Sequence, residues 1–234
     1  MVTGDSMDGM GDAIILDGVS KRLTGAHTVR VASLRVRRGT IQGLLGRAGA
    51  ETTALLRMIA GLDRPDQGKI VVEGFDAWAD RAVLRHRLAY MPQSFGAYPD
   101  LTVEAYLDFF EAGYGAATIQ RPLLTAELLE LVGLEDRRQV LVDDLDPDAR
   151  QWLALARCLI HDPDVLLLDM PLQGMSSAAC AEFTAMLREM QHLGKTVVIT
   201  SSHALELEGI CAQISHMRQG MTVDEGATDG MVGE

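Results

Sequence analysis

Apolar positions along the chain repeat at two spacings, which predicts an alternation of strands and helices. Short apolar runs at Val165–Leu168 and Val197–Ile199 have no polar face, as expected of parallel strands that are covered on both sides. Apolar residues at helical spacing recur over Arg150–Ile160 and Ala178–Met190. This alternation predicts an α/β fold around a mainly parallel sheet with flanking helices.

The first and middle parts of the chain depart from that alternation. Ile14–Leu16 and Val29–Val36 are rich in β-forming residues and predict strands near the N-terminus. Residues 95–150, roughly, show mainly helical spacing with turn signals between the apolar stretches, which predicts an inserted helical subdomain. Regular alternation then resumes, and the last helix is expected over Ala204–Ile210.

The two ends of the chain show no periodicity. Residues 1–12 and 225–234 are rich in Gly, Met and acidic side chains, so we expect flexible tails there. The folded domain is therefore expected to span residues 13–224. No internal repeat is visible.

Composition narrows the class of function. The 234 residues are 47% apolar, which suffices for one large domain, and the formal net charge of −12 argues against a nucleic-acid partner. No apolar run approaches the ~20 residues needed to cross a bilayer, and the first residues do not resemble a secretory signal. Cys158, Cys180 and Cys211 are widely spaced and odd in number, so they suggest neither disulfides nor a metal site. We expect a cytoplasmic protein without direct membrane insertion.

The segment Leu44–Leu62 has the layout of a phosphate-binding loop, with an apolar strand, a loop of small residues and a helix. Aligned with the pattern G-x-x-x-x-G-K-[ST], Gly46 is the first glycine and Glu51 stands at the second. Thr52 takes the lysine position, and Thr53 takes the hydroxyl position. The candidate nucleotide-binding residues of this segment are Gly46, Arg47, Ala48, Gly49, Ala50, Glu51, Thr52, Thr53 and Ala54.

The charges of this loop are altered at the positions that would face phosphate. Such a loop offers backbone N–H groups at a helix N-terminus, and its lysine adds a positive charge. Glu51 adds a carboxylate instead, and unit charges 4 Å apart interact by about 4 kcal/mol at an effective dielectric of 20. A micromolar ligand has only about 8 kcal/mol of binding free energy, so strong ATP binding is not expected. Glu51 either caps the helix as an acidic first-turn residue or places its carboxylate in the anion nest. The position of Arg47 in the loop disfavours it as a replacement for the missing positive charge.

Beyond the loop, the chain resembles the nucleotide-binding subunits of ATP-binding-cassette (ABC) transporters over residues 13–224. Within that family it is most similar to the ABC-2 class of exporters. The resemblance rests on the order and spacing of several segments rather than on one motif. No G-x-G-x-x-G follows a strand, which disfavours a dinucleotide-binding oxidoreductase. The segments are LLRMIAGLDRPDQGKIVVEG (55–74, after Walker A), YMPQSFGAYPDLTVEAYLDFF (90–110, Q-loop), LARCLIHDPDVLLLDMP (155–171, Walker B) and TVVITSSHALELEGIC (196–211, H-loop).

The resemblance implies a P-loop NTPase core, an N-terminal antiparallel β subdomain and an inserted helical subdomain. It also implies ATP and Mg²⁺ as cofactors. Thr53, Gln93 and Asp169 match the residues that hold the magnesium, if nucleotide binds. His203 matches the H-loop histidine that senses the γ-phosphate, and Gln93 is also the Q-loop residue that couples the site to the membrane partner.

Several motif positions depart from the family pattern. Met170 replaces the general-base glutamate, and a thioether cannot accept a proton from water. The signature LSGGQ aligns with Leu145–Ala149, where Asp146 and Pro147 suit a helix N-cap and first turn but the phosphate-facing end gains Asp146 and Asp148. The D-loop reads Gln173–Ser176 without its aspartate, and Leu23 stands where an aromatic side chain would stack on adenine.

These departures leave three hypotheses open. The leading one is an ABC ATP-binding subunit with degenerate Walker A, Walker B, signature and D-loop motifs, acting structurally or regulatorily on a polytopic membrane permease in export. The second is a slow ATPase that powers transport through Thr53, Gln93, Asp169 and His203. The third is a pseudo-NTPase scaffold without a permease. The expected subunit lies at the inner face of the membrane and forms a homodimer, or a heterodimer with another ABC subunit.

Overall fold

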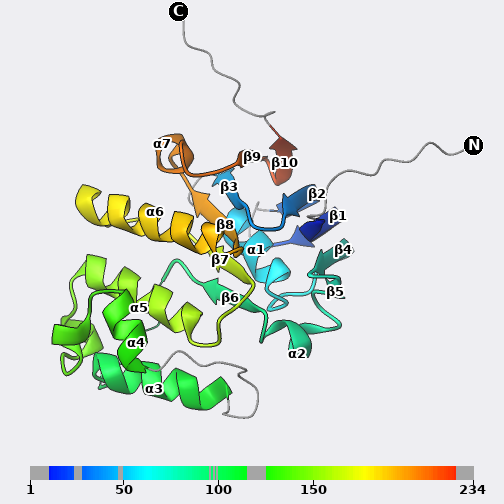
Figure 1. The fold of residues 1–234 in the computed structure, drawn as a ribbon. Helices are drawn as coiled ribbons and strands as arrows, with labels where there is room; N and C mark the ends of the chain where they lie inside the picture. The colour runs from blue at the N-terminus through cyan, green and yellow to red at the C-terminus, as the bar shows by residue number, and fades with distance from the viewer. Residues whose placement is uncertain are drawn as a thin grey trace, which may run out of the picture.

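Two β-sheets organise the fold (Figure 1). The computed structural model describes residues 11–23, 28–46, 50–94, 96, 98, 100–114 and 125–224. The tails expected at 1–12 and 225–234 lie outside these residues, except for Gly11 and Asp12, and Asp12 begins the first strand.

The larger sheet has six strands in the order β10-β9-β3-β8-β7-β6, and its neighbours are parallel except for the β9–β10 pair. All residues of β7 and β8 are buried, because helices or the smaller sheet cover both faces. The mainly parallel sheet is therefore confirmed. Its strands are β3 (Ile41–Gly46), β6 (Leu88–Met91), β7 (Val165–Leu168), β8 (Thr196–Ser201), β9 (Gln213–Arg218) and β10 (Met221–Asp224).

The smaller sheet is antiparallel, in the order β2-β1-β4-β5, and confirms the N-terminal β subdomain. The β9–β10 hairpin joins it to the larger sheet. Arg30 N donates to Gly220 O at 2.6 Å, and Thr222 Oγ1 donates to Ser33 O at 2.7 Å. The strands are β1 (Asp12–Arg22), β2 (Thr28–Arg37), β4 (Gln67–Val72) and β5 (Phe75–Asp76).

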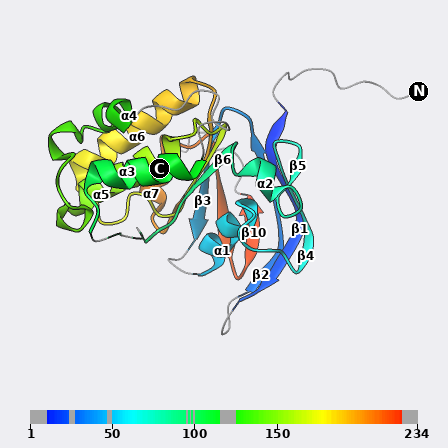
Figure 2. The ribbon, with the colours of Figure 1, turned by 90° about the horizontal axis from the view of Figure 1, so that it is seen from below.

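Helices gather on the side of the larger sheet away from the antiparallel sheet, where Figure 2 shows α3, α4, α5 and α6 together. Helix α1 lies between the sheets and follows β3 directly. None of the described helices is long and apolar enough to span a membrane. The helices are α1 (Ala50–Ile59), α2 (Arg81–Leu84), α3 (Val103–Tyr114), α4 (Thr125–Leu131), α5 (Pro147–Leu159), α6 (Ser177–His192) and α7 (Ala204–Leu207), with 3-10 turns η1 (Glu135–Arg137) and η2 (Val142–Asp144).

Two helix boundaries differ from the pattern of apolar residues. Helix α5 begins at Pro147 rather than Arg150, because Asp146 caps it and Pro147 suits the first turn. Helix α7 ends at Leu207 rather than Ile210. Glu208 is extended, with φ −61° and ψ 137°, and Gly209 has φ 77°, so the chain leaves the helix there.

Alternate residues of β7 pack into two cores. Leu166 and Leu168 belong to a cluster with the α3–α6 helices, whereas Val165 and Leu167 belong to a cluster with α1 and the antiparallel sheet. The central sheet thus separates the helical insert from the β subdomain. The central strands are therefore packed on both faces.

Candidate functional site

The residue that follows β7, Asp169, is the centre of a buried polar cluster. Its side chain is fully buried, and its carboxylate accepts hydrogen bonds from three hydroxyls. Thr53 Oγ1 donates to Oδ2 at 2.7 Å, Tyr90 Oη donates to the same oxygen at 3.3 Å, and Thr200 Oγ1 donates to Oδ1 at 3.0 Å. Side chains from three elements, α1, β6 and β8, therefore converge on the carboxylate that follows β7.

This cluster brings together two of the three expected magnesium residues. Thr53 and Asp169 present a hydroxyl and a carboxylate in direct contact, and such hard oxygen donors are those that Mg²⁺ takes. Burial, together with the neighbouring Asp169 carboxylate, raises the pKa of Tyr90, so its phenol stays a hydrogen-bond donor at neutral pH. The donor set of Thr53 and Asp169 thus fits a magnesium ion.

Sequence reasoning missed Tyr90 and Thr200 as members of the cluster. Both occur at the carboxyl ends of parallel strands, β6 and β8, beside the end of β7. Polar residues at that edge of a parallel sheet commonly reach the ligand site. That position was the available signal for both residues.

Met170, which the resemblance aligns with the general-base position, is buried. Its side chain is 4% exposed, and its backbone has φ 51°, a left-handed conformation that is unusual for a side chain of this size. The backbone is held there because Met170 N donates to Thr200 Oγ1 at 2.8 Å. The chain therefore places a thioether, which cannot accept a proton, directly after the cluster carboxylate.

Two residues in the first turn of α1, Glu51 and Thr52, face other parts of the chain. Gly220 N, in the β9–β10 turn, donates to Glu51 Oε2 at 3.1 Å, and Glu51 is an acidic residue of the first helical turn. Thr52 is fully buried, its Oγ1 has no hydrogen-bond partner among the described residues, and its methyl group lies against Gly46. A Cβ on Gly46 would lie 2.5 Å from Thr52 Cγ2. Three expected loop residues, Arg47, Ala48 and Gly49, lie outside the described residues.

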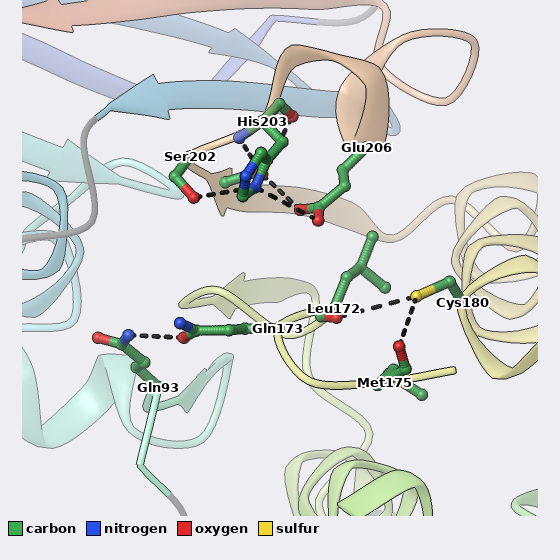
Figure 3. Close-up of polar contacts among 9 residues, drawn as sticks. Gln93, Leu172, Gln173, Met175, Cys180, Ser202, His203 and Glu206 are labelled. Carbon is green, nitrogen blue, oxygen red and sulfur yellow. Dashed lines mark hydrogen bonds and ion pairs between the residues drawn. The ribbon is translucent and has the colours of Figure 1, made fainter. Parts of the chain in front are cut away.

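The Q-loop and D-loop glutamines contact each other, as Figure 3 shows. Gln93 Nε2 donates to Gln173 Oε1 at 2.7 Å, and both side chains are exposed. His203 precedes α7, with its side chain 74% exposed. Its Nδ1 lies 3.1 Å from Ser202 Oγ and 3.6 Å from Glu206 Oε1. Thr53 and Asp169 therefore hydrogen-bond to each other, whereas Gln93 contacts Gln173 and His203 contacts Ser202 and Glu206.

Asp146 caps α5 at the position of the altered signature. Its Oδ1 accepts from Ala149 N at 2.8 Å, and its Oδ2 accepts from Arg137 Nη1 at 2.5 Å. The Ala149 N–H and the Arg137 guanidinium hold the pKa of Asp146 below its ordinary value. The expected N-cap is therefore confirmed, and the carboxylate is already used within the chain.

Asp148 joins the signature position to the D-loop. Its two oxygens accept from Ser176 N at 2.9 Å and Ser176 Oγ at 2.7 Å. Ser176 in turn caps α6, and its Oγ accepts from Ala179 N at 3.3 Å. The start of α5 and the start of α6 are thereby fastened together by a carboxylate and a hydroxyl.

Leu23 stands where the resemblance places an aromatic residue for adenine. It is partly buried and packs against the cluster formed by α1 and the antiparallel sheet. An aromatic–base contact is worth ~1–3 kcal/mol. An aliphatic side chain lacks the π-face from which that contact arises.

Comparison with known proteins gives consistent matches. A protein-family description, ABC transporter, matches residues 29–173. The chain is 34% identical over 214 residues to the Nod factor export ATP-binding protein I of Burkholderia orbicola, covering 92% of this chain and 70% of that protein. It is 30% identical over 204 residues to the ABC transporter ATP-binding protein NatA of Bacillus subtilis, covering 87% and 83%. A probable multidrug ABC transporter ATP-binding protein, YbhF of Escherichia coli, is 36% identical over 220 residues, 93% of this chain and 38% of that protein.

Solved structures share the fold at lower identity. An ATP-binding subunit of an ABC transporter superposes with a TM-score of 0.80 at 23% identity, covering 93% of this chain and 90% of that one. An ATP-binding cassette in a dimeric post-hydrolysis state, bound to ADP and Pi, also gives 0.80, at 20% identity and with 93% and 100% covered. These similarities confirm the P-loop NTPase core that the resemblance implied.

Proposed function

We propose a particular role for this chain within the family to which it belongs, the ATP-binding subunits of ABC transporters. In this proposal it is a subunit with weak or no ATP hydrolysis that acts structurally or regulatorily on a membrane permease during export. It lies at the cytoplasmic face of the membrane through that permease. It pairs with a second copy or with another ABC subunit.

The observation that carries the proposal is Met170. It is buried directly after Asp169, at the position where the family's general base would stand. No water-activating carboxylate follows the Walker B aspartate in the sequence, so the chemical step lacks its base. Thr53 and Asp169 would hold the magnesium that neutralises phosphate charge, but the residues at the loop do not match a triphosphate.

The loop supports the same proposal through charge. Glu51 brings a carboxylate to the start of α1, and the fully buried Thr52 supplies no cation. Loss of one attraction and gain of one repulsion weaken phosphate binding by several kcal/mol at an effective dielectric of 20. We therefore expect ATP affinity weaker than about 1 mM, a binding free energy under about 4 kcal/mol.

Calorimetric titration with ATP and magnesium tests this part of the proposal. The wild-type chain should show weak binding and no turnover, and the Glu51→Gly, Thr52→Lys double variant should bind at least about tenfold more tightly, a gain of about 1.4 kcal/mol. Adding Met170→Glu to that variant should then raise turnover. Micromolar, magnesium-dependent binding by the wild type, with turnover comparable to ordinary transporter domains, would overturn the degenerate assignment.

A slow ATPase is the second candidate, because the Thr53–Asp169 pair is intact. It predicts measurable hydrolysis that disappears in Asp169→Asn. The same titration separates the two candidates. Turnover that depends on Asp169 favours the slow enzyme, whereas absence of binding at millimolar ATP favours the degenerate subunit.

Permease docking is supported by an exposed aromatic group beside the Q-loop. Tyr98 is 45% exposed and Phe109 is 53% exposed, and their ring centroids lie 5.3 Å apart. Phe110 continues the group, 5.3 Å from Phe109, and the guanidinium of Arg157 lies 5.3 Å from the Phe110 ring centroid. Exposed apolar patches of this kind mark interaction surfaces.

Co-purification with a polytopic membrane subunit tests the docking surface. Phe109→Asp should abolish it, because a carboxylate would be placed in an apolar contact. Leu193→Asp is the matched control, since Leu193 is 79% exposed at the end of α6. Equal loss in both variants, or undiminished co-purification in both, would contradict the assignment of this surface.

A further inference from the structure

A groove away from the Q-loop runs between α4, α5 and α6. One end of it is formed by residues at the signature and D-loop positions, Asp146, Asp148, Ala149 and Ser176. It is an open groove of about 830 Å³, and both Figure 1 and Figure 2 show these helices close together. Its lining residues come from the end of α4, the turn after it, the start of α5 and one face of α6. None of them belongs to the connection between β6 and α3, where the aromatic docking surface lies.

One wall of the groove is a continuous helical face. Ala178, Glu182, Ala185, Met186 and Glu189 recur at helical spacing on α6 and all line the groove. From Ala178 to Glu189 this face extends about 16 Å at 1.5 Å per residue, or about three helical turns. The groove is thus long enough for a short helix to lie along it.

The floor is apolar and firmly supported. Trp152 lines the groove while its ring packs on Phe183 of the core, with the ring centroids 5.1 Å apart. Leu131, at the end of α4, is 42% exposed and faces the same space, as does Met186. An apolar strip of this kind gains free energy when a partner side chain removes it from water.

The rim is strongly acidic. Five carboxylates and one guanidinium line the groove, which gives a formal charge of −4. Arg137 is already paired with Asp146, and Asp148 is held by Ser176. Glu182 forms no ion pair within the described part of the chain, and Glu189 only approaches His192, at 3.9 Å. A partner with positive charge would therefore find carboxylates that are not neutralised internally.

We propose that this groove binds a basic amphipathic helix of a partner protein, with its apolar face on Trp152, Leu131 and Met186 and its Lys or Arg side chains toward Glu182 and Glu189. The occupant is a helix because the walls are helices and present no strand edge to extend. A negatively charged rim would repel an anionic membrane surface or a nucleic acid. Charge complementarity selects the partner, and apolar contact supplies the affinity.

Fluorescence anisotropy with a synthetic peptide tests the proposal. The probe is a fluorescein-labelled helix of about fourteen residues, about four turns, with Leu on one face and Lys on the other. It should bind the full chain with a Kd in the micromolar range. A peptide of the same composition with scrambled order, and one with Glu in place of Lys, should bind at least about tenfold more weakly.

Matched variants locate the binding. Glu182→Lys with Glu189→Lys should weaken binding at least about tenfold, and Met186→Gln should weaken it several-fold, since each removes a groove contact. The control, Asp17→Lys with Glu208→Lys, changes the total charge equally at exposed positions on β1 and after α7 and should stay within about twofold. Hydrogen exchange should slow along α6 when the peptide saturates the chain. Circular dichroism confirms that each variant is folded.

Three results would overturn the proposal. The first is equal weakening in the groove and control variants, which would mean attraction to overall negative charge. The second is absence of saturable binding at about 100 µM peptide, well above the expected Kd. The third is self-association of the chain, seen by sedimentation and abolished by Glu182→Lys with Glu189→Lys, which would make a second copy the occupant.

Discussion

Two acidic clusters in this protein use similar chemistry in opposite surroundings. Asp169 is fully buried and accepts from three hydroxyls on three different elements. Asp146 and Asp148, by contrast, lie at the surface and hold helix starts through nearby backbone and side-chain donors. The buried carboxylate gathers hydroxyls from separate elements, whereas the exposed carboxylates make internal contacts at the starts of two helices.

Burial decides how much a carboxylate contributes to the stability of the fold. A buried hydrogen-bond donor left without an acceptor costs about 1–3 kcal/mol, because water cannot replace the lost partner. An exposed donor is rehydrated at once.

Asp169→Ala should lower the free energy of unfolding by about 3 kcal/mol. It removes the acceptor of the Thr53, Tyr90 and Thr200 hydroxyls together. Urea denaturation followed by circular dichroism measures the change. Asp169→Asn is the control and should cost less, because one oxygen acceptor and the side-chain shape remain. A loss below about 1 kcal/mol for the alanine variant would show that burial does not separate the two clusters.

Asp146→Ala should lower the free energy of unfolding by about 1 kcal/mol, the usual value for loss of a helix N-cap. The bond from Ala149 N disappears, and the start of α5 loses its acceptor. Asp146→Asn should recover most of this loss, since an amide oxygen still caps the helix. The same urea assay detects it, and a loss as large as that of Asp169→Ala would abolish the contrast.

Arg137→Ala should change stability by less than about 0.5 kcal/mol. Its ion pair with Asp146 joins side chains that are 46% and 50% exposed, and surface pairs of this kind contribute little. Thermal unfolding at low and high salt checks this. A salt-dependent loss above about 1 kcal/mol would mean that the exposed cluster acts as a cooperative network.

The smallest effect is a pH dependence carried by Asp146. Its pKa is lowered by Ala149 N–H and Arg137, so its contribution is present above the ordinary value of 3.8 and is lost as the pH falls through the lower folded value. Burial lowers the pKa of His161 to about 4, so the whole fold also loses stability as the pH falls from 6.5 toward 4. The profile is therefore read as the difference between wild type and Asp146→Asn. That difference should shrink only below about pH 4, and a constant difference would contradict the assignment.

Local signals were sufficient for much of the fold. The continuous apolar run Val165–Leu168 predicted a strand buried on both faces, and β7 has those bounds. Asp146 and Pro147 predicted the start of α5 because capping depends only on neighbouring residues. The resemblance assigned Thr53 and Asp169 to one magnesium site, and their side chains are in direct contact.

Contacts between distant segments could not be predicted in the same way. Glu51 has the acidic first-turn position considered from the sequence, but its bond to Gly220 depends on a hairpin 169 residues later. Asp148 reaches Ser176 because two helix starts are adjacent in space. The sequence showed that Glu51 and Asp148 depart from the family pattern. Their hydrogen-bond partners could not be predicted, because these contacts depend on tertiary packing.

The order of the larger sheet has a consequence for how the chain is made. Strand β3 is the first of that sheet to be synthesised, yet its two neighbours, β8 and β9, are among the last. The antiparallel sheet, in contrast, is complete once Asp76 has left the ribosome. We expect the β subdomain to form during translation while β3 waits with both edges unpaired, so the nascent chain depends longest on protection from aggregation at this strand.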